Sequence, residues 1–161
     1  MNTWEKIDRA FSVLINITYA AIIIMVSLQI LCRAIPVLRA PSWTEEGSRY
    51  LMVYLVAFGA GLAIKADSFV SVDTLKVALG ARKGAILEIV INCLLLVFFS
   101  IFFFGAIKFF ILGMPQNSIS MPFFPMSSIY FSLLILSVQV IAYLIRKMVG
   151  IILQLKTREL N

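Results

Sequence analysis

The sequence predicts an all-α integral membrane protein with four transmembrane helices. We expect a tilted bundle, with amphipathic helical segments at the membrane interface and both termini in the cytoplasm. The chain has 161 residues, of which 61% are hydrophobic, and its mean hydropathy is +1.00, well above that of a soluble domain. Charged residues make up only 14% and fall between four apolar stretches. Three stretches are long enough to cross a bilayer as a helix, and the second, whose strictly apolar part from Leu51 to Ile64 is short for a span, is expected to begin in the headgroup region. A chain of this length fits a single membrane domain over residues 1–161.

The first predicted span covers about residues 11–33. No charged residue lies between Phe11 and Cys32, and Arg33 and Pro36 end the stretch. The apolar run is longer than the hydrophobic region of a secretory signal, so we expect an uncleaved first transmembrane helix.

The second predicted span covers about residues 48–66 and follows a polar segment. Ser42 and Glu45 have the spacing of a capping box at a helix start, and Glu45 and Arg49 have the spacing of a helical ion pair. Trp43 is of a type that anchors at the membrane interface. Glycines and alanines predict a small-residue face for close helix packing; they are Gly59, Gly61, Ala57, Ala60 and Ala63.

The third and fourth predicted spans cover about residues 86–112 and 126–147. The third is rich in phenylalanine, and its Glu88 and Lys108 lie near its two ends, where both can reach the interface. The connection before it, Asp67–Lys83, fits a short surface helix, although residues 70–73 also alternate like a strand. The uncharged loop Gly113–Pro125 fits either a rigid proline turn or a docking loop. The phenylalanines fit contact with lipid or with a protein partner.

Lysines and arginines are distributed unevenly between the two predicted sides of the membrane. Ten of the fourteen fall at the termini and in the second loop: Lys6, Arg9, Lys65, Lys76, Arg82, Lys83, Arg146, Lys147, Lys156 and Arg158. The other four lie in or beside the first and third loops: Arg33, Arg39, Arg49 and Lys108. Cytoplasmic loops collect basic residues, so we expect both termini in the cytoplasm and the first and third loops on the outer face.

Several functional classes need residue types that the chain lacks. It has no histidine, which excludes bis-histidine haem ligation, histidine-based metal sites and a histidine general base. The net charge of +6 is explained by basic cytoplasmic loops, so we expect no nucleic-acid partner. The middles of the spans offer only uncharged polar residues, whereas a self-sufficient transporter usually has an ionisable group there. We therefore expect no enzyme, no cofactor and no metal, but a membrane subunit that serves another protein.

A charged cluster between the first two spans is the most informative feature of the sequence; its members are Arg33, Trp43, Glu45, Glu46 and Arg49. It fits a helix start with hydrated interfacial charges. It also fits an ion pair from Arg33 to Glu45 or Glu46 that fixes the start of the second span against the end of the first. On the second interpretation, Arg33→Ala should loosen the subunit or its assembly.

An ordered set of residues extends beyond this cluster: Gln29-Ile-Leu-Cys-Arg33, Pro41-Ser-Trp43-Thr-Glu45-Glu46, Arg49-Tyr50, Gly59-Ala60, Lys65 and Val72-Asp73. This set resembles the small membrane subunit, the DctQ type, of tripartite ATP-independent periplasmic (TRAP) transporters. The resemblance gives structural or interface roles to Gln29, Arg33, Trp43, Glu45, Glu46, Arg49, Gly59 and Asp73. Many members have a histidine before the last element, where this chain has Phe69.

The resemblance implies a multi-pass accessory subunit of the bacterial inner membrane, surrounded by lipid. It would support a large membrane subunit of the DctM type, which moves substrate by a sodium-driven elevator motion. A periplasmic binding protein of the DctP type would deliver a carboxylate, either sialic acid or a C4-dicarboxylate, and overall similarity leans towards the sialic-acid branch. Two alternatives remain open: an autonomous four-helix transporter acting as an oligomer, and a membrane anchor for another complex.

Overall fold

The computed structural model describes the backbone of residues 3–35, 41–66, 73–118 and 120–159. Four helices account for most of these residues: α1 (Thr3–Ala34), α2 (Ser42–Lys65), α3 (Asp73–Gly113) and α4 (Ser127–Glu159). Each helix contains a stretch that is long and apolar enough to cross a membrane. The predicted class, an all-α protein with four membrane-spanning helices, is confirmed.

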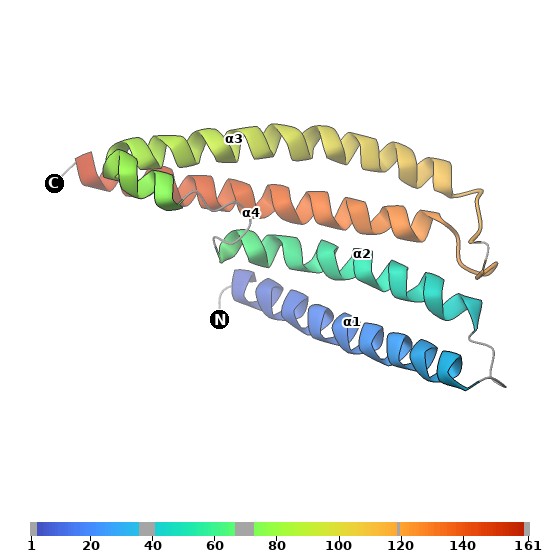
Figure 1. The fold of residues 1–161 in the computed structure, drawn as a ribbon. Coiled ribbons are helices and arrows are strands. Elements are labelled where there is room, and N and C mark those ends of the chain that lie inside the picture. The colour runs from blue at the N-terminus through green and yellow to red at the C-terminus, as the bar shows by residue number, and fades with distance from the viewer. Residues whose placement is uncertain (1–2, 36–40, 67–72, 119, 160–161) are drawn as a thin grey trace.

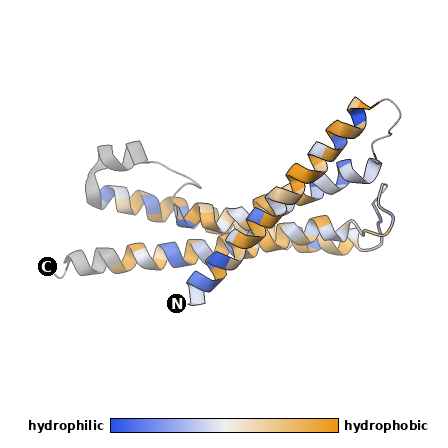
Figure 2. Ribbon diagram, turned by 90° about the horizontal axis from the view of Figure 1, so that it is seen from below, coloured by the Kyte–Doolittle hydropathy of each residue, from blue (hydrophilic) through white to orange (hydrophobic). Residues whose placement is uncertain are grey.

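The four helices lie side by side in one layer, in the order α1, α2, α4, α3 (Figure 1). α2 packs against α1 and α4, and α4 packs against α2 and α3. In the part of the chain that the structure describes, the two edge helices do not pack against each other. Seen from below, α1 runs obliquely to the other helices (Figure 2). The spans thus form an open layer in place of the expected bundle, and α2 and α3 are consecutive in sequence but separated by α4.

The layer has two polar ends. The start of α1 and the ends of α2 and α4 lie towards one side, which we call the terminal end (Figure 1). The end of α1, the start of α2 and the loop between α3 and α4 lie at the other side, which we call the loop end. Orange, apolar residues cover most of the helix surface between the two ends (Figure 2).

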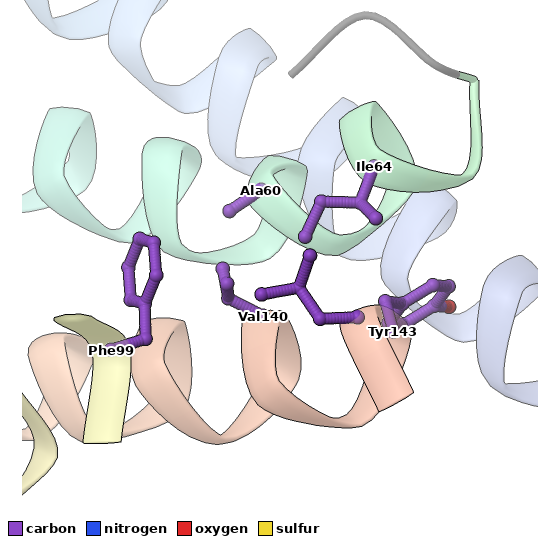
Figure 3. Close-up of a cluster of buried hydrophobic side chains, with 6 residues drawn as sticks. Ala60, Ile64, Phe99, Val140 and Tyr143 are labelled. Atoms are coloured by element: carbon purple, nitrogen blue, oxygen red, sulfur yellow. The ribbon is translucent and has the colours of Figure 1, made fainter. Parts of the chain in front are cut away.

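The hydrophobic core lies where α2, α4 and α3 meet. It consists of Ala60, Ile64, Phe99, Val140, Tyr143 and Leu144, and Figure 3 shows these side chains converging from the three helices. Within the apolar windows, one third of α2 and of α4 is buried, but only 6% of α1 and 11% of α3. The two central helices thus pack against other helices of the chain over more of their length, whereas the edge helices present most of their apolar surface outward.

A glycine allows the close contact between the two central helices. A Cβ atom at Gly61 would lie 2.6 Å from Cγ of Gln139 and 2.7 Å from Cδ2 of Tyr143. The residues that pack at this contact, Ala57, Ala60, Gly61 and Ile64, recur with helical spacing on one face of α2. A Cβ at Gly59 would meet nothing within 4 Å, so the small-residue face passes through Gly61 and not through Gly59.

Two local expectations are corrected. No side chain caps the start of α2, whose N-cap is Pro41, so the capping box predicted from Ser42 and Glu45 is not formed. Instead, Thr44 donates its amide and its hydroxyl to the Pro41 carbonyl, at 3.1 and 2.7 Å. The third helix begins at Asp73, so the connection expected to be a separate surface helix is helical there but forms the first turns of α3, before the candidate span that begins at Lys83. Residues 67–72, including Phe69 and most of the strand alternative, lie outside the described residues.

Candidate functional site

At the loop end, Glu45 is the centre of an exposed group of ion pairs. Its Oε1 lies 2.6 Å from an Arg49 guanidinium nitrogen, which confirms the ion pair predicted from the spacing of four. Its Oε2 lies 3.9 Å from Arg33 at the end of α1. More than half of each of these three side chains is exposed. The contact predicted between Arg33 and Glu45 is present, but it is long and lies at the surface.

Glu46 connects α2 to the loop between α3 and α4. Its Oε1 accepts a hydrogen bond from the Tyr50 hydroxyl at 3.0 Å. Its Oε2 accepts one from the Ser120 amide at 3.0 Å, across 74 positions of sequence. This carboxylate, rather than that of Glu45, holds the two outer segments together.

Gln29 provides a polar contact between α1 and α2. Its Nε2 donates to the Ser48 hydroxyl at 3.5 Å, and that hydroxyl in turn donates to the Glu45 carbonyl at 2.9 Å. Trp43 is 44% exposed at the start of α2, a position that suits an interfacial anchor. The structure therefore brings together five of the residues singled out from the sequence: Gln29, Arg33, Glu45, Glu46 and Arg49.

Two of the residues singled out lie away from the charged cluster. Gly59 lies in the middle of α2, where its Cα position faces open space. Asp73 is the first residue of α3, at the terminal end of the layer (Figure 1). Gly59 does not contribute to the polar contacts described at the loop end.

The loop from Met114 to Met126 is compact. Asn117 and Pro125 form an antiparallel bridge, the Ser118 amide donates to the Phe124 carbonyl at 3.0 Å, and the Met126 amide donates to the Gln116 carbonyl at 2.8 Å. These contacts support the expectation of a rigid turn. At its tip Phe123 is 97% exposed, so the same turn presents a large apolar side chain outward.

A groove of about 450 Å³ lies between the charged cluster and this loop. It is lined by Ser42, Glu45, Glu46, Arg49, Tyr50 and Ser120, with Met126 and Ile129 at its side. Both carboxylates and one guanidinium therefore face a cavity that opens at the surface of the loop end.

At the terminal end, a second polar group forms around Asp8, a residue that the sequence patterns did not single out. Asp8 is buried in α1 and accepts hydrogen bonds from the Tyr143 hydroxyl of α4 and from Nζ of Lys65 in α2, the latter at 2.5 Å. Arg146 lies over the Trp4 ring, 4.8 Å from its centroid, and Trp4 meets Tyr143 edge-on. We call these five residues the Asp8 cluster. The sequence signal was an acid just before the first apolar stretch, at the same membrane edge as Lys65.

Beside the Asp8 cluster, α3 and α4 are joined by an ion pair. Lys147 and Glu88 lie 2.9 Å apart, and only about a fifth of each side chain is exposed. Glu88, which was expected to reach the interface, pairs there with a cation on the neighbouring helix. Within the ranges that the structure describes, no group of three or more acidic, cysteine or histidine residues is placed to hold a metal ion.

A family model described as "Tripartite ATP-independent periplasmic transporters, DctQ component" matches residues 22–154. The matched region contains the whole charged cluster and also Lys65, Tyr143 and Arg146 of the Asp8 cluster, whereas Trp4 and Asp8 precede it. No curated protein matches the chain.

Proposed function

Because this chain belongs to the family of DctQ components of tripartite ATP-independent periplasmic transporters, we propose that it is the accessory subunit supporting a sodium-coupled carboxylate importer. DctQ components are small multi-pass proteins of the inner membrane and are not enzymes. Their family implies a large membrane subunit of the DctM type and a binding protein of the DctP type as partners.

The distribution of polar contacts carries the proposal of a supporting role. The ion pairs described in the structure lie at the two ends of the layer, around Glu45, Asp8 and Glu88. The middles of the four apolar stretches contain no charged residue. An ion or a carboxylate crossing this layer would have to leave water without a charged partner, which is costly. This favours a structural role for the chain, in which another subunit moves the substrate.

For the orientation, we propose that the terminal end faces the cytoplasm and the loop end faces the periplasm. The unequal number of basic residues at the two ends supports this placement. The charged cluster and Phe123 would then face the compartment of the binding protein. Glu46 would keep the Ser120 segment in a fixed position for that contact.

For the substrate, we propose a carboxylate of the sialic-acid or C4-dicarboxylate class, with sialic acid favoured by overall resemblance. The sequence set from Gln29 to Asp73 supports membership in such a system. Selectivity would be a property of the large subunit and the binding protein.

An assembly experiment tests the supporting role. The tagged chain is co-expressed with a large membrane subunit of the DctM type from the same organism and purified in mild detergent. We expect the two to co-purify in equal amounts, and we expect the chain alone to catalyse no sodium-driven uptake of sialic acid or succinate in liposomes. Uptake by the chain alone would support the autonomous transporter instead, and purification without any large subunit would contradict the supporting role.

A further inference from the structure

A groove at the terminal end lies beside the Asp8 cluster and has a basic lining. Its volume is about 380 Å³, and it is lined by Lys65, Glu88, Tyr143, Arg146, Lys147 and Gly150, flanked by Ile64 and Ile151. Three of these residues carry positive charge and one carries negative charge. The groove therefore has a net positive lining at the level where the apolar stretches of α2 and α4 end.

The carboxylates near the groove are already engaged. Glu88 pairs with Lys147, and the carboxylate of Asp8 accepts from Lys65 and Tyr143. Arg146 lies over Trp4, with its Cζ 4.8 Å from the ring centroid, and a cation–π contact of this kind does not use up the N–H donors of the guanidinium. Among the described residues Arg146 forms no ion pair. Its guanidinium donors can therefore serve an anion from outside the described part of the chain.

We propose that this groove binds the phosphate of an anionic membrane phospholipid, such as phosphatidylglycerol. A planar guanidinium flanked by two ammonium groups matches a phosphodiester, to which arginine can donate two parallel hydrogen bonds. Basic pockets between membrane helices at an interface are the expected place for such headgroups. The apolar side chain of Ile151, which flanks the groove, would meet the start of the acyl chains. The proposal needs the membrane location of the chain but not its role in transport.

Gly150 provides a way to close the groove without disturbing the fold. A Cβ at this position would meet nothing within 4 Å, and Gly150 lines the groove, so a side chain added here starts from open space at the groove wall. Arg146→Gln removes the guanidinium, whereas Gly150→Phe leaves every charge in place and fills the space. Arg9→Gln is the matched control, because Arg9 is exposed on α1, lies at the same end and does not line the groove.

The test uses the two tryptophans, which lie at opposite ends of the layer. In a Trp43→Phe background the remaining Trp4, under Arg146, reports on lipid beside the groove. The purified full chain is titrated in detergent micelles with brominated phosphatidylglycerol or brominated phosphatidylethanolamine, and the quenching of Trp4 fluorescence is measured. We expect the anionic lipid to bind about fivefold more tightly or better, since each basic residue near an anionic headgroup contributes roughly that factor.

The variants separate the possible sources of the effect. Arg146→Gln and Gly150→Phe should each reduce the preference for phosphatidylglycerol about fivefold or abolish it, and Arg9→Gln should leave it unchanged. Equal quenching by both lipids, or an equal loss in Arg9→Gln, would overturn the proposal. Protection by millimolar inorganic phosphate would show a free-phosphate site instead. Loss of bound lipid on assembly with the large subunit would assign the groove to a protein contact, which also overturns it.

Discussion

At the scale of single residues, the two adjacent glutamates of the charged cluster have different tasks. Glu45 points to Arg49 and Arg33 at the surface, and such exposed pairs contribute about 0–1 kcal/mol. Glu46 accepts a backbone amide from a loop 74 residues away. We therefore expect Arg33→Ala to have a small effect on the stability of the isolated chain, and Glu46 to determine whether the outer loop stays in place.

Glu46→Ala should release the loop between α3 and α4. The Ser120 amide loses its acceptor, so amide hydrogen exchange of residues 116–126, measured by mass spectrometry, should become faster. Glu45→Ala is the matched control, since it removes a neighbouring carboxylate that does not contact the loop, and exchange there should stay as in the parent. Equal exchange in the two variants would show that Glu46 does not hold the loop.

At the residue scale, a pair within one helix could be predicted from the sequence, whereas pairs between helices could not. Glu45 and Arg49 could be paired because they lie one helical turn apart. Asp8 meets Lys65 and Tyr143 across 57 and 135 residues. The choice of these partners depends on which helices are neighbours, and local spacing contains no information about that.

At the scale of elements, α2 and α4 approach each other closely because Gly61 has no side chain. The side chains of Gln139 and Tyr143 occupy the space that a Cβ would need. Gln139 also donates from Nε2 to the Phe58 carbonyl at 3.0 Å. This contact, together with the core around Val140 and Leu144, fixes the centre of the layer.

Gly61→Ala should destabilise the chain, by about 1–3 kcal/mol, because the added methyl forces Gln139 and Tyr143 to shift. Gly59→Ala is the matched control, where the methyl enters open space and the helix gains roughly 0.5–1 kcal/mol in propensity. Thermal unfolding in detergent, followed by circular dichroism, measures both. The same midpoint in the two variants would contradict the close contact at Gly61.

The four helices were predictable from apolar length alone, but their order in the layer was not. A helix in a membrane is apolar towards lipid and towards protein, so its sequence does not distinguish the two faces. On α3, Phe99 is buried in the core while Phe98 and Phe104 are exposed. The small residues of α2 were the usable signal for a packing face, and they predicted close helix contact for α2 without identifying its partner.

At the scale of the whole molecule, the open layer leaves much of α1 and α3 uncovered. Exposed apolar side chains line both helices, among them Ile17, Ile24, Leu94, Ile101 and Phe104. In a membrane this surface is covered by lipid or by another subunit. A thin layer with polar contacts at its two ends is well suited to pack against a larger membrane protein, as the proposed accessory role requires.

Omission of single components from a reconstituted transporter tests that role most directly. Liposomes containing the large subunit, this chain and the binding protein are given a sodium gradient, and uptake of labelled sialic acid and of labelled succinate is measured. The account predicts uptake of one carboxylate by the complete set, none by this chain alone, and loss of uptake when this chain is left out. Uptake by this chain without the large subunit, or full uptake in its absence, would contradict it.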